Sequence, residues 1–201
     1  MKTSVAKALF NSHSYIEYRK IVSDLLSNGL SSGNEQSEKY TNYSKLNETR
    51  MNRLDKTMTI SDENIQKLQF LKRDYIWLVI SEGWCADSAQ ILPIINKLAL
   101  HSDKVDLKIV FRDENDDLMN QFLTNGAKAI PKLIIIDKET GTLLDVWGAR
   151  PAGATQFMKD YKAKNGAIDD TAKADLQMWY LHDKGVSTQN EIVNLMLDLE
   201  L

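Results

Sequence analysis

The sequence predicts an α/β protein in which helices flank a central mixed β-sheet, with helical extensions at both termini. Between residues 75 and 164, apolar periodicity and turn residues give the order strand, helix, strand, helix, strand, strand, helix. The first two strands are joined through a helix, which implies parallel pairing with a right-handed crossover. The last two strands are joined by a short turn, which predicts an antiparallel hairpin. A sheet with both kinds of pairing is mixed.

The composition is that of an ordinary globular protein. The chain has 201 residues, of which 43% are hydrophobic and 26% are charged. We expect an N-terminal helical extension at residues 1–60, a core at 61–165, and a C-terminal helical extension at 166–201 that packs on the core. The net charge of −3 argues against binding to nucleic acid or to acidic membranes, because both favour a basic surface.

The sequence favours a cytoplasmic protein. No apolar run approaches the ~20 residues that cross a bilayer, and residues 1–10 lack the continuous apolar core of a signal peptide. The single cysteine, Cys85, excludes an internal disulfide and fits a reducing compartment. Three scattered histidines do not indicate a metal site, so we expect no metal and no cofactor.

Two helices are predicted before the core. Residues 12–28 form the first, which ends at Gly29, and a polar loop follows at 30–36. Residues 37–58 form the second. The side chains expected on its core face are Tyr40, Tyr43, Met51, Leu54 and Met58. Arg50 and Arg53 of this helix are suited to an anionic partner, although a solvated helix face is the simpler interpretation.

The centre of the chain places its only cysteine between a strand and a helix. Residues 61–71 begin with the capped start Ser61-Asp62-Glu63-Asn64 and lead to an apolar strand at 75–80, buried on both faces. A helical pattern begins just after Cys85 and ends near Leu100. The first-turn amides and the dipole of a helix favour an anion, which predicts a lowered pKa for Cys85.

The rest of the chain completes the sheet and adds helices. Residues 105–111 alternate as a strand, and the acidic run 112–117 opens a helix that carries Leu118, Phe122 and Leu123. Further elements are predicted as strands at 132–136 and 143–147 around a turn at 137–142, and as helices at 152–164, 170–184 and 188–199. The last helix opens with a capping-box pattern, Thr188 and Glu191.

Four short stretches resemble the thioredoxin family, in the right order. Trp84-Cys85-Ala86-Asp87-Ser88 resembles the Trp-Cys-x-x-Cys active site, with serine in place of the second cysteine. Pro93 matches the proline that kinks the active-site helix. Residues 126–131 resemble the segment that ends in the cis-proline, and Gly148-Ala149 resembles the end of the last strand. The resemblance covers about residues 75–161 and is closest to bacterial thioredoxin-like proteins of unassigned role.

The resemblance implies a site made of Trp84, Cys85, Asp87 and Ser88, facing Ile130 and Pro131. In thioredoxins the backbone before a cis-proline, here Ile130, pairs with an extended substrate segment. Trp84 is expected to cap the thiol and to offer an aromatic surface. Ser88 cannot form a disulfide, but its hydroxyl can donate a hydrogen bond to a Cys85 thiolate.

Dithiol exchange is therefore excluded, and monothiol chemistry remains. Cys85 would form a mixed disulfide with a protein or with glutathione, or a sulfenic acid with peroxide, and an external thiol would resolve it. Two departures weaken this interpretation. Val79 stands where many thioredoxins carry a buried carboxylate, and the Asp87 carboxylate would raise the pKa of Cys85 against the effect of the helix.

Three hypotheses of function follow. The favoured one is a monothiol thiol-disulfide oxidoreductase at Cys85, and its partner would be a protein or a low-molecular-weight thiol or disulfide. The alternative is a non-catalytic module that holds a partner protein or peptide in the groove. The third is a glutathione-dependent transferase-like activity, although no segment specifically indicates a glutathione site. A cysteine-protease pair with His101 has no supporting signature. A monothiol enzyme needs a cysteine with a lowered pKa and an accessible sulfur, whereas a binding module needs neither. The sequence does not indicate the oligomeric state. We further expect the N-terminal helices to cover a face or edge of the sheet and to modify access to the groove.

Overall fold

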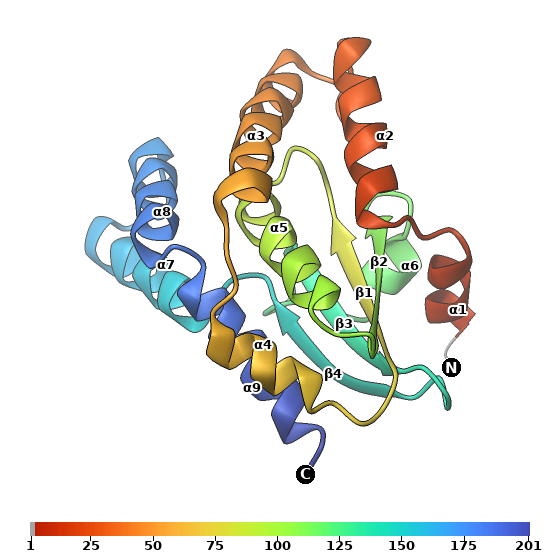
Figure 1. Ribbon diagram of the computed structural model, residues 1–201. Coiled ribbons are helices and arrows are strands. Elements are labelled where there is room, and N and C mark those ends of the chain that lie inside the picture. The colour runs from red at the N-terminus through yellow and green to blue at the C-terminus, as the bar shows by residue number, and fades with distance from the viewer. Residues whose placement is uncertain (1–2) are drawn as a thin grey trace.

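A computed structural model of the protein describes residues 3–201 (Figure 1). In chain order, its elements are α1 (Thr3–Phe10), α2 (Tyr15–Ser27), α3 (Glu38–Thr57), α4 (Asp62–Gln69), β1 (Tyr75–Ser81), α5 (Ala86–Leu100), β2 (Val105–Phe111), α6 (Asp116–Met119), β3 (Lys132–Asp137), β4 (Leu143–Gly148), α7 (Ala152–Asn165), α8 (Asp170–Asp183) and α9 (Val186–Asp198). The predicted order of strands and helices in the core is confirmed.

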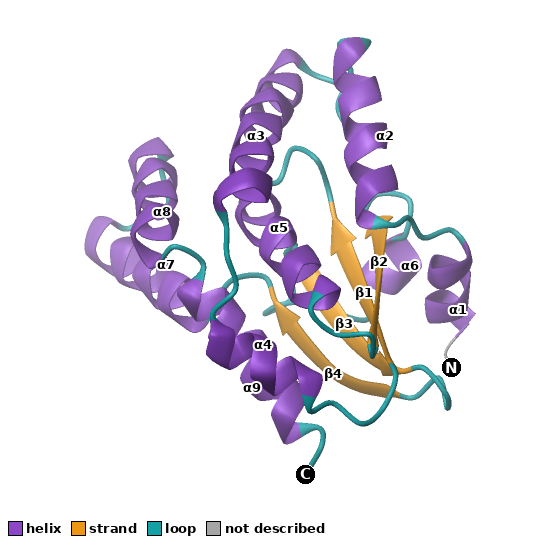
Figure 2. Cartoon of the chain, viewed as in Figure 1, coloured by secondary structure: helices purple, strands orange, loops and turns teal. Residues whose placement is uncertain are grey.

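The four strands form one mixed sheet with the order β2-β1-β3-β4. Strand β1 pairs in parallel with β2 and antiparallel with β3, and β3 and β4 form the hairpin. Trp77 in the centre of β1 lies opposite Leu107 of β2 and Ile135 of β3. Because both neighbours of β1 are strands and both faces carry helices, β1 is almost entirely buried (Figure 2).

The two faces of the sheet contribute to two hydrophobic cores of different size. Tyr75, Trp77 and Val79 alternate onto the larger core, which also takes side chains from α2 to α5 and from α7 to α9. Leu78 and Ile80 alternate onto the smaller core, which lies under α1 and α6. Segments from both ends of the chain therefore complete the larger core, so the terminal helices are part of the packed structure.

The N-terminal segment also covers an edge of the sheet. His13 exchanges two backbone hydrogen bonds with Ile109 of β2, each 2.8 Å long. Helix α2 begins directly afterwards, with a capping box formed by Ser14 and Glu17. Its Tyr18 stacks on Phe111 at the end of β2, with 5.1 Å between the ring centroids. The N-terminal helices thus lie over both an edge and a face of the sheet.

Several local predictions were wrong. Helix α1 was not predicted, and α6 ends at Met119, four residues before Leu123, which is 40% exposed. After α6 the chain continues in i to i+3 turns, which still bring Phe122 into the smaller core. Tyr43 lies on the exposed side of α3, whose buried face begins with the polar residues Thr41, Ser44 and Asn47.

The expected capping box of the last helix is also absent. Helix α9 begins at Val186 after Gly185, so Thr188 lies inside the helix. Glu191 instead accepts hydrogen bonds from the Trp147 indole and from the amide of Ala152. Among residues 3–201, no helix combines the length and apolarity needed to cross a membrane.

Candidate functional site

Cys85 lies at the junction of the central strand and helix α5, as predicted. The chain leaves β1 at Ser81, and Cys85 is the N-cap residue of α5. The Ser88 amide donates a hydrogen bond to the sulfur at 3.4 Å. The thiol donates to the carbonyl oxygen of Ile130 at 3.3 Å. Only 8% of Cys85 is exposed, so the protonated thiol is the form that fits this environment.

Of the two opposing effects expected at Cys85, lowering of the pKa by the helix start and raising by Asp87, the structure favours the rise. Burial raises the pKa of the thiol to about 11, and the nearby Asp87 charge adds to the rise. Hydrogen bonds from the first turn of α5 oppose the rise but do not outweigh it. The Ser88 hydroxyl is buried and has no well-formed hydrogen bond among residues 3–201, although its side chain is placed to help lower the pKa of Cys85.

Asp87 is held by two partners that the sequence did not reveal. Arg150, just after β4, donates from Nε to one carboxylate oxygen at 2.8 Å, and a terminal guanidinium nitrogen forms an ion pair with the same oxygen at 2.8 Å. The hydroxyl of Tyr180 on α8 donates to the other oxygen, also at 2.8 Å. Charge-assisted bonds of this kind fix a carboxylate in place. Asp87 therefore joins the start of α5 to the end of the sheet and to the C-terminal extension.

Trp84 is half-buried between two side chains. The ring of Tyr40 on α3 meets it edge-on, with 5.2 Å between the centroids, and the Arg112 guanidinium lies 4.7 Å from the ring centroid. The second contact has cation–π geometry. The aromatic surface that Trp84 was expected to offer is thus shared with the N-terminal extension and with the end of β2.

The loop before Cys85 is fastened to the N-terminal extension. The Asn47 side-chain amide on α3 donates to the Gly83 carbonyl oxygen at 2.9 Å, and the Gly83 amide donates to the Ser32 hydroxyl at 2.8 Å. Glu82 is fully buried, bonded to Ser32 and to the Asp113 amide. Burial raises the pKa of Glu82 to about 7. A buried carboxylate is therefore present near the site, although Val79 occupies the position where the resemblance placed one.

Ile130 and Pro131 face the cysteine across the groove. The peptide bond between them is cis, and Ile130 receives the thiol hydrogen bond described above. The Ile130 amide donates no backbone hydrogen bond within residues 3–201. Gly148 packs against Pro131, and a Cβ atom at Gly148 would lie 2.4 Å from the Pro131 carbonyl oxygen.

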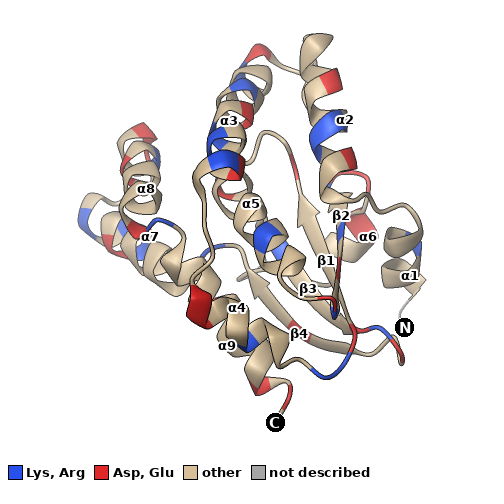
Figure 3. Cartoon of the chain, in the orientation of Figure 1, with Lys and Arg blue, Asp and Glu red and all other residues tan. Residues whose placement is uncertain are grey.

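These residues border an open groove of about 610 Å³. Trp84, Cys85, Asp87 and Ile130 line it, whereas Ser88 and Pro131 are buried behind it. Its other walls carry five basic residues, Arg112, Lys128, Arg150, Lys159 and Lys162. Among the described residues that line the groove, Asp87 alone is acidic, and Arg150 pairs with it. Arg112 and Lys128 are paired with Asp113 and Asp116 outside the groove, so within residues 3–201 the unpaired positive charge of the groove comes from Lys159 and Lys162. Elsewhere, charges of both signs are spread over the molecule (Figure 3).

The histidines lie elsewhere. His101 is the C-cap of α5, at the opposite end of the helix from Cys85. With a rise of 1.5 Å per residue, the two lie about 24 Å apart along the axis. This separation excludes a catalytic pair. Within the described part of the chain, no three His, Cys, Asp or Glu side chains form a group suited to a metal ion.

The fold and the site together define a thioredoxin-like protein with a single site cysteine. The features are the mixed four-stranded sheet, the cysteine that caps α5 and the cis-proline that faces it. A family model described as Thioredoxin matches residues 33–162. This match spans more than half of the chain, and the protein therefore belongs to that thioredoxin family. The matched region includes α3, which carries Tyr40 and Asn47.

Two solved structures are similar to the whole chain. One is a protein of unknown function from Pseudomonas aeruginosa, 18% identical, with a TM-score of 0.55 over 92% of this chain and 98% of that one. The other is an HIV epitope scaffold, 19% identical, with a TM-score of 0.55 over 92% of this chain and 99% of that one. At such identities the likeness shows the fold alone. A comparison with curated proteins found no match.

Proposed function

We propose that the protein is a non-catalytic thioredoxin-fold module that holds an extended, acidic segment of a partner protein in the groove beside Cys85. The observation that carries this proposal is a groove whose walls are basic and whose cysteine is a buried, protonated thiol. A nucleophilic cysteine must be a thiolate, and a pKa of about 11 leaves very little thiolate at neutral pH. A binding groove has no such requirement.

The charge of the groove supports an acidic partner. Lys159 and Lys162 are exposed on α7, and neither forms an ion pair within residues 3–201. The chain as a whole has a net charge of −3, so an acidic partner would be repelled elsewhere and attracted here. Complementary charge of this kind mainly sets the rate and specificity of association.

The free amide of Ile130 supports an extended partner. An extended segment laid along residues 128–130 would accept a hydrogen bond from this amide, and its side chains would alternate between the groove and solvent. Acidic side chains on the inner face would reach Lys128, Lys159 and Lys162. The thiol would then act as a small apolar group on the floor. We place this interaction in the cytoplasm, in accordance with the single reduced cysteine.

The experiment measures binding of fluorescein-labelled extended peptides by fluorescence anisotropy. The peptides share one backbone pattern and carry glutamate, glutamine or lysine at alternate positions. We expect the glutamate peptide to bind, with an affinity that falls as salt increases. Lys159→Glu should weaken it about tenfold, whereas Lys164→Glu on the same helix, outside the groove, should not. Equal binding of all three peptides, or of none, would overturn the proposal.

Monothiol exchange is the second candidate, favoured by the position of the sulfur. Cys85 borders the groove, and the Ser88 amide points at Sγ. The rate of Cys85 alkylation by iodoacetamide against pH separates the two candidates. A midpoint above the ~8.5 of free cysteine supports the binding module, whereas a midpoint at least one unit below it would restore the redox interpretation.

A further inference from the structure

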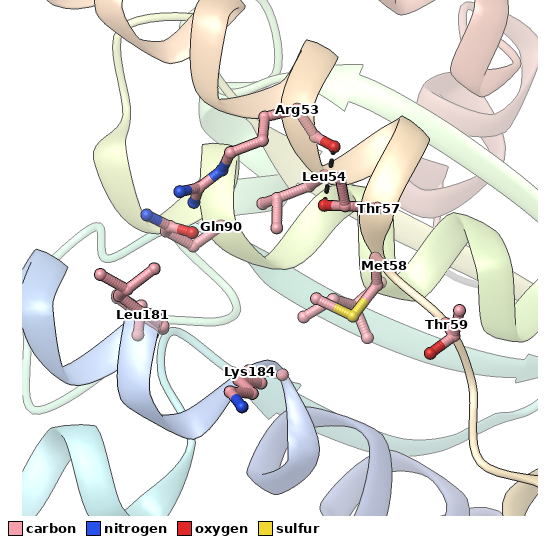
Figure 4. A pocket seen from close by; sticks show the side chains of 11 residues that line it. Arg53, Leu54, Thr57, Met58, Thr59, Gln90, Leu181 and Lys184 are labelled. Carbon is pink, nitrogen blue, oxygen red and sulfur yellow. Dashed lines mark hydrogen bonds between the residues drawn. The ribbon is translucent and has the colours of Figure 1, made fainter.

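A second cavity, of about 300 Å³, lies further along helix α5 than the groove, beside Gln90 and Ile94. Its walls come from α3, from α5 and from the end of α8 with the turn that follows it. Figure 4 shows the Arg53 guanidinium beside the Gln90 amide at one end of the cavity and Lys184 at the other. Leu54, Met58 and Leu181 line the space around which these polar groups are placed.

The cavity combines an apolar wall with cations that have no acidic partner. Within residues 3–201, neither Arg53 nor Lys184 forms an ion pair, and no Asp or Glu lines the cavity. By contrast Arg19, which meets α3 from the other side, is paired with Glu48 and Asp55. Burial and, after it, the neighbouring Arg53 charge lower the pKa of Arg50, so a second cation lies close to Arg53 on α3.

The size and lining of the cavity define the ligand. A volume of about 300 Å³ is at the lower end of the range for small-molecule sites and suits a compact molecule. Leu54 and Met58 offer it aliphatic and thioether surface, which favours an apolar body. A guanidinium at the edge of an apolar wall matches a carboxylate, which it can bind through two parallel hydrogen bonds.

We propose that this cavity is a binding site for a small amphipathic carboxylate, with its apolar body on Leu54 and Met58 and its carboxylate on Arg53. Lys184 adds a second positive charge at the mouth and disfavours cationic ligands. The site is distinct from the Cys85 groove and does not depend on the function proposed for it. The two sites share one residue contact, because Tyr180 lines the cavity and its hydroxyl donates a hydrogen bond to Asp87 in the groove.

The test uses three probes that differ only in the head group: octanoate, 1-octanol and octylamine. Binding to the full-length protein is measured by calorimetry below the aggregation concentration of each probe, and the amide of Gly185 in the cavity wall serves as the NMR reporter of the site. We expect octanoate to bind at one site at least tenfold more tightly than octanol, and octylamine more weakly than either.

Two variants locate the site. Arg53→Gln should weaken octanoate at least tenfold and leave octanol unchanged, whereas Lys45→Gln, which removes a charge from the same helix away from the cavity, should change neither. Leu181→Trp, at a side chain that is 45% exposed, should fill the space and weaken octanoate and octanol together without unfolding the protein. Equal affinities of the three probes, no binding of octanoate, or octanoate binding that Arg53→Gln leaves intact would each overturn the proposal.

Discussion

The backbone at Gly148, one residue of the groove wall, leaves no room for a side chain. Its φ angle is +115°, and a Cβ atom would lie 2.4 Å from the Pro131 carbonyl oxygen. The backbone of Gly148 fixes the position of a Cβ atom, and the oxygen belongs to the backbone just before β3, so the contact cannot be relieved by a rotamer change. We expect Gly148→Ala to lower the free energy of unfolding by about 3 kcal/mol or more, measured by urea denaturation.

Gly126→Ala is the matched control for this prediction. Gly126 also has a positive φ, +78°, but a Cβ atom there would meet no heavy atom within 4 Å. Only the cost of the left-handed conformation remains, about 1 kcal/mol. If the two substitutions destabilise the protein equally, the close approach of Gly148 to Pro131 does not limit stability.

At the same scale, the sequence revealed the part of the site that is contiguous in the chain. The Trp84 to Ser88 motif and the segment ending in Ile130 and Pro131 are local patterns, and the fold brings the two together at Cys85. Arg150 and Tyr180 were missed because they reach Asp87 from 63 and 93 positions away, and neither stands in a motif. The sign of the Cys85 pKa shift stayed open because burial, which dominates it, is a property of the packed structure.

At the scale of elements, α3 holds the loop that carries Cys85. Asn47 is buried on this helix and donates to the Gly83 carbonyl oxygen at 2.9 Å. Asn47→Ala would leave that buried oxygen without its donor, at a cost of about 1–3 kcal/mol. We expect a loss of that size in urea denaturation, together with faster hydrogen exchange at the amides of residues 83 and 85.

Asn42→Ala on the exposed side of the same helix controls for helix propensity. Asn42 makes no side-chain hydrogen bond within residues 3–201. Its replacement should leave both the stability and the exchange rates of the loop near those of the wild type. Loop exchange that is unchanged in Asn47→Ala would show that α3 does not fasten the site.

Most helices and strands were predictable because their apolar periodicity persists over several turns or over a whole strand. Helices α1 and α6 were not correctly placed, since eight and four residues hold too few repeats to establish a period. The start of α9 was misplaced for another reason. Thr188 and Glu191 have capping-box spacing, but Glu191 bonds to Trp147 and Ala152, which only the tertiary structure brings near.

At the scale of the whole molecule, Glu82 lies where three parts of the chain meet. It follows the last residue of β1, accepts a hydrogen bond from Ser32 of the N-terminal extension, and accepts another from the Asp113 amide after β2. Burial raises its pKa to about 7, from an ordinary value of 4.5; the Asp113 charge acts in the same direction, and Ser32, the Asp113 amide and Arg112 oppose it. The Glu82 carboxyl therefore holds its proton more strongly in the native state than in the unfolded chain.

This preference makes the stability of the whole fold depend on pH. A raised pKa in the folded state contributes stability that is fully present below pH 4.5 and is lost as the pH rises through about 7. The difference of about 2.5 units corresponds to at most about 3 kcal/mol. We expect urea denaturation of the wild type to give a free energy of unfolding that falls between pH 5 and pH 8 by up to this amount. Glu82→Gln keeps the side-chain shape without the titrating proton, so the free energy of unfolding of this variant should depend less on pH by the same amount. If the pH profiles of the two proteins run parallel, a buried, protonated Glu82 does not link the N-terminal extension to the sheet.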